Sequence, residues 1–259
     1  MPLPAAIQTY HDLLTPEIAA ASDEQLRAAL RPRNLYFGDR PLCTVLRPRF
    51  LTLPLYRYVQ ARSRVILSAF GKAHRAAMAD ADFRAQFGLL DWEESLLQAD
   101  PGFAQPSPTS RLDSFITADG EGFRLQFTEY NAETPAAMGY NDSLSEVFYG
   151  LPIMGRFLRQ YDVQPIPARK GVLHALLDSY HEFAGRREAP RIAILDWREV
   201  PTYGEFVLFQ DYFRAHGLEC VIADPREVEY RNGKLMAGDF HITLLYKRVL
   251  LSELIDRMG

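Results

Sequence analysis

Apolar positions recur at helical spacing through most of the first hundred residues. This spacing predicts helix over residues 4–30, over 56–78 and over 80–98. Between the first two of these stretches, four prolines predict an extended, loop-rich segment over 31–55. We therefore expect residues 1–110 to form a mainly helical region.

The spacing changes from helix to strand at residue 111. The sequences RLDSFIT (111–117) and FRLQFTEYN (123–131) lie on either side of a glycine-containing turn, which predicts a β-hairpin. Helical spacing returns over 143–160 and 171–184. We group the hairpin and the loop that follows it as a segment of residues 111–150.

The last third of the chain alternates strands and helices. Apolar strands are predicted at 191–197 and 218–224 with a helix between them, and another strand is predicted at 241–248. A strand–helix–strand order with short connections predicts a Rossmann-like parallel layer covered by helices. Residues 151–259 are therefore expected to form an α/β subdomain, and the whole chain an α/β fold.

The composition is that of an ordinary globular protein, with 47% apolar residues and a formal net charge of −4. Two cysteines, Cys43 and Cys220, are too few for a disulfide framework. No apolar run reaches the roughly 20 residues of a membrane span, and the first residues lack the pattern of a signal peptide. We therefore expect a cytoplasmic protein without a membrane partner.

Positive charge is concentrated between residues 24 and 75. This basic segment holds eleven Arg and Lys residues against two acids, Glu24 and Asp39. Such a block attracts the phosphates of a nucleic acid or of a nucleotide, although a solvated or acid-paired surface is the simpler explanation. The negative total charge and the sparse aromatic residues argue against nucleic acid as the main partner.

Four polar residues of the hairpin are candidates for chemistry. Arg111 and Asp113 lie two positions apart on the first strand, and Glu129 and Asn131 lie two positions apart on the second, so each pair shares a face. Two carboxylates and an amide oxygen are hard ligands that suit Mg²⁺ rather than zinc. The sequence therefore predicts half of a metal site on this hairpin.

Whether the two pairs meet depends on the hairpin register. A three-residue loop at 118–120 pairs odd-numbered residues with odd-numbered ones and places Asp113, Glu129 and Asn131 on one face. A two-residue loop at 119–120 shifts the pairing by one residue and separates them. The register is therefore a test of the predicted half-site.

The α/β subdomain offers a second group of candidates. The turn at 201–205 lies between the carboxyl end of a strand and the start of a helix, which is the usual ligand crevice of open α/β sheets. Thr202 and Tyr203 in this turn are candidate substrate contacts, with helix capping as the alternative. Asp224, at the end of the next strand, is a third candidate.

The hairpin sequence resembles a known family. RLDSF followed by FTEYNAETPAAMG is similar to the early part of glutathionylspermidine synthetases and of the wider circularly permuted ATP-grasp ligases, which carry an R-x-D strand and then an E-Y-N-A-D-T-P-like strand. The later runs ILDW, ADP and LLYKRVLLSEL are similar as well. The resemblance extends from about residue 35 to the C-terminus and implies that 151–259 is a pre-ATP-grasp subdomain.

The resemblance implies roles for the matching residues. Asp113, Glu129 and Asn131 would hold Mg²⁺ between the phosphates of ATP, and Arg111 would steady the transferring phosphoryl group. The family reaction joins a small-molecule or peptide carboxylate to an amine, through an acyl-phosphate made with ATP. Mg²⁺ and ATP are therefore the expected cofactor and co-substrate.

This sequence departs from the family pattern in two ways. Ala136, Ala137 and Met138 stand where the synthetases place hydroxyl residues, which argues against glutathione as the substrate. The nucleotide-gripping lysines and the lid of the family would follow the point where this chain stops, and none of its four lysines lies in a matching pattern. We therefore expect the N-terminal part of such a ligase, without its ATP-grasp half and inactive alone. The alternatives are a stand-alone binding or regulatory module of the same fold, or a nucleic-acid-binding protein that uses the basic segment.

Overall fold

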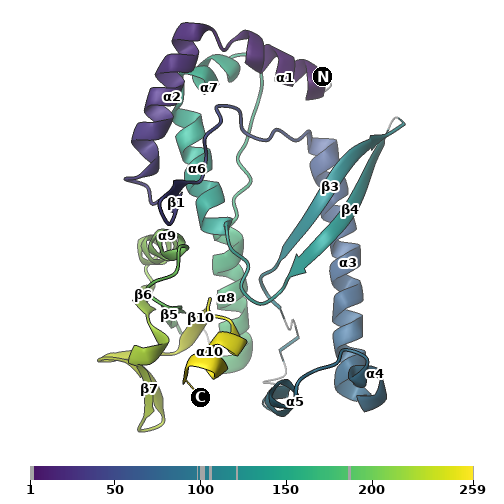
Figure 1. Ribbon diagram of the computed structural model, residues 1–259, viewed down its shortest axis with the longest axis vertical. Helices are drawn as coiled ribbons and strands as arrows, with labels where there is room; N and C mark the ends of the chain where they lie inside the picture. The colour runs from purple at the N-terminus through teal and green to yellow at the C-terminus, as the bar shows by residue number, and fades with distance from the viewer. Residues whose placement is uncertain are drawn as a thin grey trace. The chain divides into compact units, whose positions relative to one another are not determined.

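The computed structural model of the chain describes residues 3–97, 99, 103–104, 107–120, 122–185 and 188–258 (Figure 1). The fold is mixed α/β and forms two compact units. Unit 1 comprises Met1–Thr52, Glu133–Leu177 and Glu188–Gly259, and unit 2 comprises Leu53–Ala132 and Asp178–Arg187. The N-terminal helices therefore belong to the same unit as the C-terminal α/β segment, and the hairpin belongs to the other.

Four helices form the first part of unit 1: α1 (Leu3–Asp12), α2 (Pro16–Leu30), α6 (Met138–Gly150) and α7 (Pro152–Phe157). They pack around Tyr10, which is fully buried and contacts the rings of Phe50 and Phe157 at centroid distances of 5.4 and 5.1 Å. The single helix expected over 143–160 is wrong. It divides because Pro152 has no backbone N–H to donate and instead opens a new helix.

The segment expected to be extended over 31–55 is confirmed as loop-rich. It contains two short paired strands, β1 (Tyr36–Phe37) and β2 (Arg40–Pro41). The hydroxyl group of Tyr10 donates a hydrogen bond to the backbone oxygen of Leu46 at 2.6 Å, which fixes this segment against α1.

A three-stranded parallel sheet forms the second part of unit 1. Its strands are β5 (Arg191–Leu195), β6 (Glu219–Ala223) and β10 (Leu244–Lys247), in the order β10-β5-β6. Helix α9 (Tyr203–Ala215) connects β5 to β6, and α8 (Arg169–Ala184) contributes its first half to the same core. Every residue of β5 after the first is buried, as expected for a strand covered on both faces.

In this sheet β6 pairs with one edge of β5, and β10 pairs with the other edge. The carboxyl ends of β5 and β10 therefore form the point where the strand order reverses, which is the usual place for a ligand in this class of sheet.

The remaining elements of unit 1 surround this edge. They are the 3₁₀ turn η1 (Pro225–Glu227), the antiparallel strands β7 (Val228–Arg231), β8 (Lys234–Ala237) and β9 (Phe240–Ile242), and helix α10 (Leu251–Met258). The expected strand over 241–248 is divided between β9 and β10. It divides at Thr243, because the backbone N–H of Thr243 bonds to Arg191 at 3.0 Å and begins the pairing with β5.

Unit 2 is built on one long helix, α3 (Leu53–Ala79), and the hairpin of β3 (Arg111–Asp119) and β4 (Gly122–Asn131). The single helix expected over 80–98 is wrong, since α4 (Ala81–Ala85) and α5 (Asp91–Leu97) are separate. They are separated at Gly88, whose φ of +62° lies outside the helical region and favours glycine. Part of the segment 100–110, which precedes the hairpin, lies outside the described residues.

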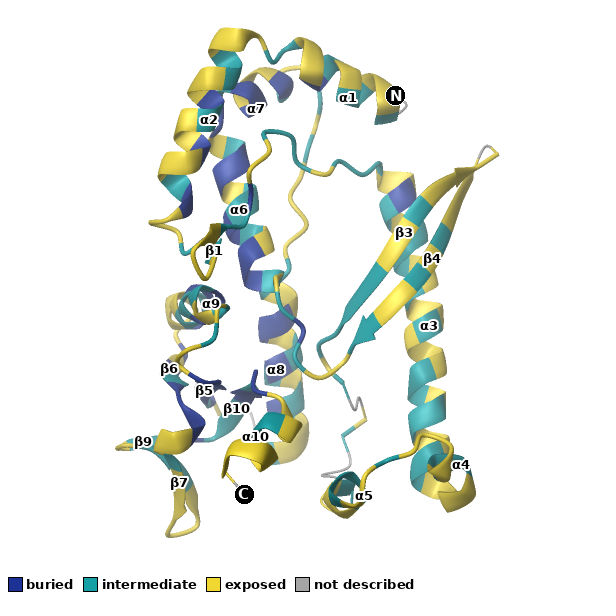
Figure 2. Cartoon of the chain, in the orientation of Figure 1, coloured by how far each residue is buried: buried dark blue, intermediate teal, exposed yellow. Residues whose placement is uncertain are grey.

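Burial differs between the two units (Figure 2). The buried side chains of α6, α7, α9 and the parallel sheet form the core clusters of unit 1. Helix α3 and the hairpin are mostly exposed or half-buried. Among the described residues, no helix combines the length and the apolar character needed to cross a membrane.

Candidate functional site

The hairpin brings the four predicted residues together, by a route other than the expected one. Near the turn, Asp119 pairs with Gly122, so the loop expected at 118–120 is wrong and the pairing there joins odd to even positions. The register then shifts by one residue beyond Asp113, at a β-bulge that adds Thr128 to β4. The bulge restores the pairing of odd with odd positions.

Beyond the bulge, Asp113 lies directly opposite Glu129 and Arg111 lies directly opposite Asn131. Because residues two apart share a face, all four side chains lie on one side of the hairpin. We call these four residues the hairpin site.

The other side of the hairpin explains why the bulge is present. The Tyr130 ring stacks on Phe70 of α3 with centroids 4.3 Å apart and planes 17° apart. Phe123 also faces α3, with its ring centroid 6.4 Å from that of Tyr58, and the bulge keeps Phe123 and Tyr130 on the same side, which two residues seven apart on a regular strand could not share. The Thr128 hydroxyl donates a hydrogen bond to the backbone oxygen of Asp113 at 3.1 Å and fixes the bulge.

Arg111 holds the charge of Asp113. Its Nε lies 2.8 Å from Asp113 Oδ1, and its Nη2 lies 3.4 Å from Oδ2. The hydrogen bond from Arg111 lowers the pKa of the Asp113 carboxyl, and a hydrogen bond with Glu129 adds a smaller lowering. Asp113 is therefore ionised at neutral pH.

Asn131 has an unsatisfied donor. Its Nδ2 is buried and has no hydrogen-bond partner among the described residues. A buried donor without an acceptor costs about 1–3 kcal/mol, so an oxygen atom of a ligand would be stabilised at this position.

The hairpin site is not a complete metal cage. Among the residues that the structure describes, no group of three His, Cys, Asp or Glu side chains could hold a metal ion. Two carboxylates and one amide oxygen fit Mg²⁺, which takes only one or two carboxylates from a protein and keeps water and phosphate oxygens as its other ligands. The donor set of Asp113, Glu129 and Asn131 therefore fits half of a Mg²⁺–nucleotide site.

The predicted residues of unit 1 lie at the edge of the parallel sheet. Thr202 precedes α9 without a capping hydrogen bond from its side chain. Its backbone oxygen accepts hydrogen bonds from the Glu205 N–H at 2.9 Å and from the Tyr140 hydroxyl at 3.3 Å. Tyr203 is 39% exposed, and its ring contacts Phe206 edge-on. The Thr202 hydroxyl and the Tyr203 ring therefore remain available to a ligand.

Asp224 is buried and uses both carboxylate oxygens within its own chain. Oδ1 accepts from Arg226 N at 3.0 Å and from Arg226 Nε at 2.7 Å, while Oδ2 accepts from Arg198 N at 3.0 Å and from Arg226 Nη2 at 2.6 Å. The Arg226 hydrogen bond holds the pKa of Asp224 well below its usual range. This geometry makes Asp224 the organiser of the loop rather than a free acceptor.

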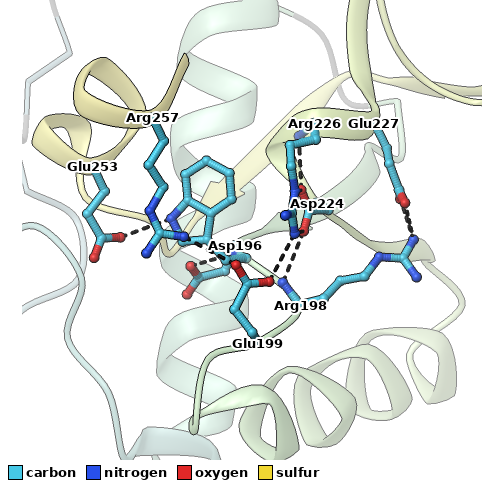
Figure 3. Close-up of polar contacts among 9 residues, drawn as sticks. Asp196, Arg198, Glu199, Asp224, Arg226, Glu227, Glu253 and Arg257 are labelled. Carbon is cyan, nitrogen blue, oxygen red and sulfur yellow. Dashed lines mark hydrogen bonds and ion pairs between the residues drawn. The ribbon is translucent and has the colours of Figure 1, made fainter. Parts of the chain in front are cut away.

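Further ion pairs extend from Asp224 along the edge of the sheet (Figure 3). Glu199 binds Arg226 at 2.9 Å and Arg257 of α10 at 3.2 Å, and Arg198 binds Glu227. Trp197 donates its indole N–H to Glu253 at 3.1 Å, and the Arg257 guanidinium lies 4.6 Å from its ring centroid. These contacts fasten α10 to the end of β5.

Sequence reasoning missed Asp196, which directly follows the central strand. It is 7% exposed, and its Oδ1 accepts a hydrogen bond from the Trp197 N–H at 2.8 Å. Burial raises the pKa of its carboxyl. The sequence RIAILD carries the signal, because an acidic residue that ends a fully apolar strand lies at the carboxyl edge of the sheet.

Sequence reasoning also missed a buried ion pair beside Asp196. Arg248 Nη2 lies 3.1 Å from Glu205 Oε2, and the two side chains are 2% and 0% exposed. Glu205 Oε1 accepts from the Gly139 N–H at 2.9 Å, and Arg248 donates to the Tyr246 hydroxyl at 3.1 Å. This pair joins the starts of α6 and α9 to the end of β10. No spacing in the sequence indicates it, because the residues are 43 positions apart.

Comparison with known proteins gives a relation at the level of the fold. No protein-family model matches the chain, and no curated protein matches it either. Among solved structures, the apo form of a glutathione synthetase-like effector (GSS30) from Globodera pallida superimposes with a TM-score of 0.59 at 12% identity. The match covers 93% of this chain and 60% of that chain. The chain therefore shares its fold with part of a glutathione synthetase-like protein.

Proposed function

We propose that this chain is the N-terminal part of a circularly permuted ATP-grasp ligase that joins a carboxylate to an amine. The hairpin site carries the proposal, because directly paired residues from two strands place two carboxylates, an amide and an arginine on one face. The fold shared with part of a glutathione synthetase-like protein supports it.

Asp113, Glu129 and the amide oxygen of Asn131 would hold Mg²⁺ in this proposal. The bound ion supplies neutralisation of the negative charge on the phosphates of ATP. The Nδ2 of Asn131, which has no hydrogen-bond partner among the described residues, would donate a hydrogen bond to a phosphate oxygen. Arg111, which orients Asp113, would steady the phosphoryl group that is transferred.

The proposed reaction has two steps. A carboxylate oxygen of the substrate attacks the γ-phosphorus of ATP, which forms an acyl-phosphate and releases ADP. The nitrogen of a neutral amine then attacks the acyl carbon, the bond to the phosphate oxygen breaks, and an amide, inorganic phosphate and a proton are released. The carboxylate and the amine belong to small molecules or peptides.

Thr202 and Tyr203 are the proposed substrate contacts of unit 1. They stand at the start of α9, where backbone N–H groups and the helix dipole favour a carboxylate. Ala136, Ala137 and Met138 offer no side-chain hydroxyl groups between the hairpin and α6, so a substrate other than glutathione is proposed.

The isolated chain should not complete the reaction. It spans 60% of the glutathione synthetase-like chain that it matches. Among the described residues, none of the four lysines makes a hydrogen bond or ion pair with a residue of the hairpin site; Lys247 instead binds Glu133 at 2.7 Å. We therefore propose that residues outside this chain bind the adenine and the γ-phosphate of ATP.

Metal binding tests the proposal without depending on turnover. We expect the chain to bind Mn²⁺, a paramagnetic substitute for Mg²⁺, in the presence of ADP, as measured from the electron paramagnetic resonance signal of free Mn²⁺. Asp113→Asn and Glu129→Gln each remove one carboxylate ligand and should weaken binding by about tenfold or more.

Asp119→Asn is the matched control, because Asp119 lies on the same strand as Asp113 and, among the described residues, its carboxylate binds Arg124 at 3.1 Å and no residue of the hairpin site. It removes the same charge from the same hairpin and should leave Mn²⁺ binding unchanged. Equal binding by all four proteins would remove the half-site from the proposal, and so would an equal loss in all three variants.

A further inference from the structure

Helix α3 carries positive charge without any acidic residue. Its 27 residues include five basic side chains and neither Asp nor Glu. All five are exposed, and none makes a hydrogen bond or ion pair with another described residue. They are Arg57, Arg62, Arg64, Lys72 and Arg75.

Two arginines of the basic segment outside α3 are paired with acids. Arg27 binds Asp23 at 2.7 Å, and Arg33 binds Glu146 at 3.4 Å. An acid-paired surface therefore accounts for these two arginines of unit 1. It does not account for α3, where the positive charges have no acidic neighbour on their own helix.

Four of the five charges line up along the helix. At about 100° per residue, Arg57, Arg64 and Arg75 lie within about 20° of one another, and Lys72 lies about 60° from Arg57. The row extends about 27 Å along the helix axis. We call these four residues the basic stripe.

The basic stripe points away from the hairpin. Phe70, whose ring stacks on Tyr130, lies about 140° around the helix from Arg57. The positions between the charges of the stripe are filled by Ala61 and Ser68, which are also exposed. Leu53 and Val65 are exposed as well and lie about 40° and 80° around the helix from Arg57, so apolar side chains border the stripe without interrupting its row of charges.

We propose that the basic stripe binds the phosphodiester backbone of a nucleic acid. The phosphates of a nucleic acid place negative charges at regular intervals along a line, and the stripe places positive charges along a line. Binding of the stripe to the nucleic acid would release counterions from the phosphates. Three of the four residues are arginine, whose planar fork matches a phosphate group. The net charge of −4 weakens the attraction of the chain as a whole for a polyanion, but the field close to α3 is set by the local charges, which on this helix are all positive.

The shape of the surface disfavours two other anionic partners. A helix that lies on a membrane needs a wide apolar face beside its basic one, whereas Tyr58 and Phe70 of α3 contact rings of the hairpin and leave Leu53, Val65 and Leu67 as separate exposed side chains. A protein partner needs an apolar interface centre, and the exposed apolar side chains lie at the border of the stripe rather than at its centre. The proposal is independent of the ligase function and does not rest on it.

The test uses the whole chain and a fluorescein-labelled single-stranded oligonucleotide of about 20 nucleotides, with binding measured by anisotropy. For four phosphate contacts, the logarithm of the association constant should fall with the logarithm of salt concentration with a slope of about −3. Replacing all four residues of the basic stripe by Gln should weaken binding at least tenfold, as about four charges are lost. Circular dichroism checks that the helix content is unchanged.

The matched control removes the same charge from unit 1. This control variant should retain the oligonucleotide affinity of the unmodified chain. It replaces four exposed arginines by Gln, namely Arg27, Arg33, Arg156 and Arg159. An equal loss in both variants would show that net charge alone is measured, and would overturn the proposal. The absence of binding to the unmodified chain would overturn it as well, as would equal or tighter binding of polyglutamate or of phosphatidylserine vesicles.

Discussion

Unit 1 and unit 2 differ in how they bury their apolar side chains. Unit 1 contains three clusters of buried residues, on its helices and on both faces of its parallel sheet. Among the described residues of unit 2, the buried hydrophobic side chains are Leu55 and Tyr180. Unit 2 instead exposes Val65, Phe87 and Phe115 by 55–67%.

The difference indicates which part of the molecule can be stable by itself. A two-stranded hairpin is marginally stable in water without further packing, and the hairpin of unit 2 packs on α3 with few buried side chains, whereas the parallel sheet of unit 1 with its packed helices has a complete core. Exposed apolar side chains of this size commonly mark surfaces that contact another chain or segment. The hairpin site therefore lies on the unit that depends more on further contacts, which agrees with the proposal that the ligase needs residues outside this chain.

The largest expected change in unfolding free energy comes from replacing a phenylalanine of unit 1, and it is compared with the replacement of a phenylalanine of unit 2. Phe209 is fully buried between α9 and the sheet, so Phe209→Ala should lower the free energy of unfolding of unit 1 by about 4 kcal/mol. Phe115 is 67% exposed, and Phe115→Ala should change the stability of unit 2 by less than about 0.5 kcal/mol.

Urea unfolding can be followed separately in the two units, because each contains one tryptophan. Trp197 is buried in unit 1, and Trp92 is half-buried on α5 of unit 2. A Trp92→Phe background leaves Trp197 as the reporter for Phe209→Ala, and amide hydrogen exchange of the hairpin reports on Phe115→Ala. Similar losses in both variants would mean that unit 2 has a core as dense as that of unit 1.

The second prediction concerns the buried ion pair. Glu205→Gln leaves the Arg248 guanidinium without a counter-charge at a site where both side chains are at most 2% exposed. Breaking such a pair should cost about 3 kcal/mol, since a buried charge without its partner is poorly solvated. Urea unfolding with Trp197 as the reporter measures the loss.

Glu219→Gln is the control for this prediction. Glu219 binds Arg191 at 2.6 Å, and its side chain is 61% exposed. Its removal should change the stability by less than about 1 kcal/mol. A loss as large as that of Glu205→Gln would contradict the importance given to burial.

Elements with regular spacing could be predicted from the sequence, and their interruptions could not. The long helix α3, the hairpin strands and the strand–helix–strand order around α9 follow directly from periodicity. The divisions at Gly88 and Pro152 were missed because periodicity continues across them, although glycine and proline are the residues that allow a chain to leave a helix.

The hairpin site shows the same limit at the level of single residues. Spacing of two along each strand placed Arg111 with Asp113 and Glu129 with Asn131, but the bulge that joins the pairs depends on the packing of Tyr130 on α3. The pair of Glu205 and Arg248 has no local pattern at all. Long-range packing decides both, and a single sequence does not display it.

The third prediction compares two neighbouring carboxylates at the sheet edge. Asp224→Asn removes a charged acceptor of four hydrogen bonds and should cost about 2 kcal/mol at neutral pH. The pKa of Asp224 is lowered, mainly by the hydrogen bond from Arg226. Its stabilisation is therefore present above the unfolded pKa of about 3.9 and is lost as the pH falls from there through the folded pKa.

Asp196 should show the opposite sign. Its pKa is raised, mainly by burial, so the folded state favours the protonated form. Its contribution is fully present below the unfolded pKa and is lost as the pH rises through the folded pKa, with a slope of at most about 1.4 kcal/mol per pH unit. The urea midpoints of Asp196→Asn and of the unmodified chain should be measured from pH 3.5 to 7. The midpoint of Asp196→Asn should rise relative to that of the unmodified chain as the pH increases through this window. Parallel curves would mean that Asp196 is solvated.

The smallest expected effect concerns the contact that supports the hairpin site. Phe70→Leu keeps an apolar side chain but removes the stacking on Tyr130, which should weaken the hairpin by about 1 kcal/mol. We expect faster amide hydrogen exchange on β3 and β4, and weaker Mn²⁺ binding by a smaller factor than in Asp113→Asn. The reason is that Phe70 acts through the strands while Asp113 would contact the ion. Unchanged exchange would mean that other contacts hold the hairpin on α3, and a loss of Mn²⁺ binding as large as that of Asp113→Asn would mean that the four residues of the hairpin site come together only while Tyr130 is packed.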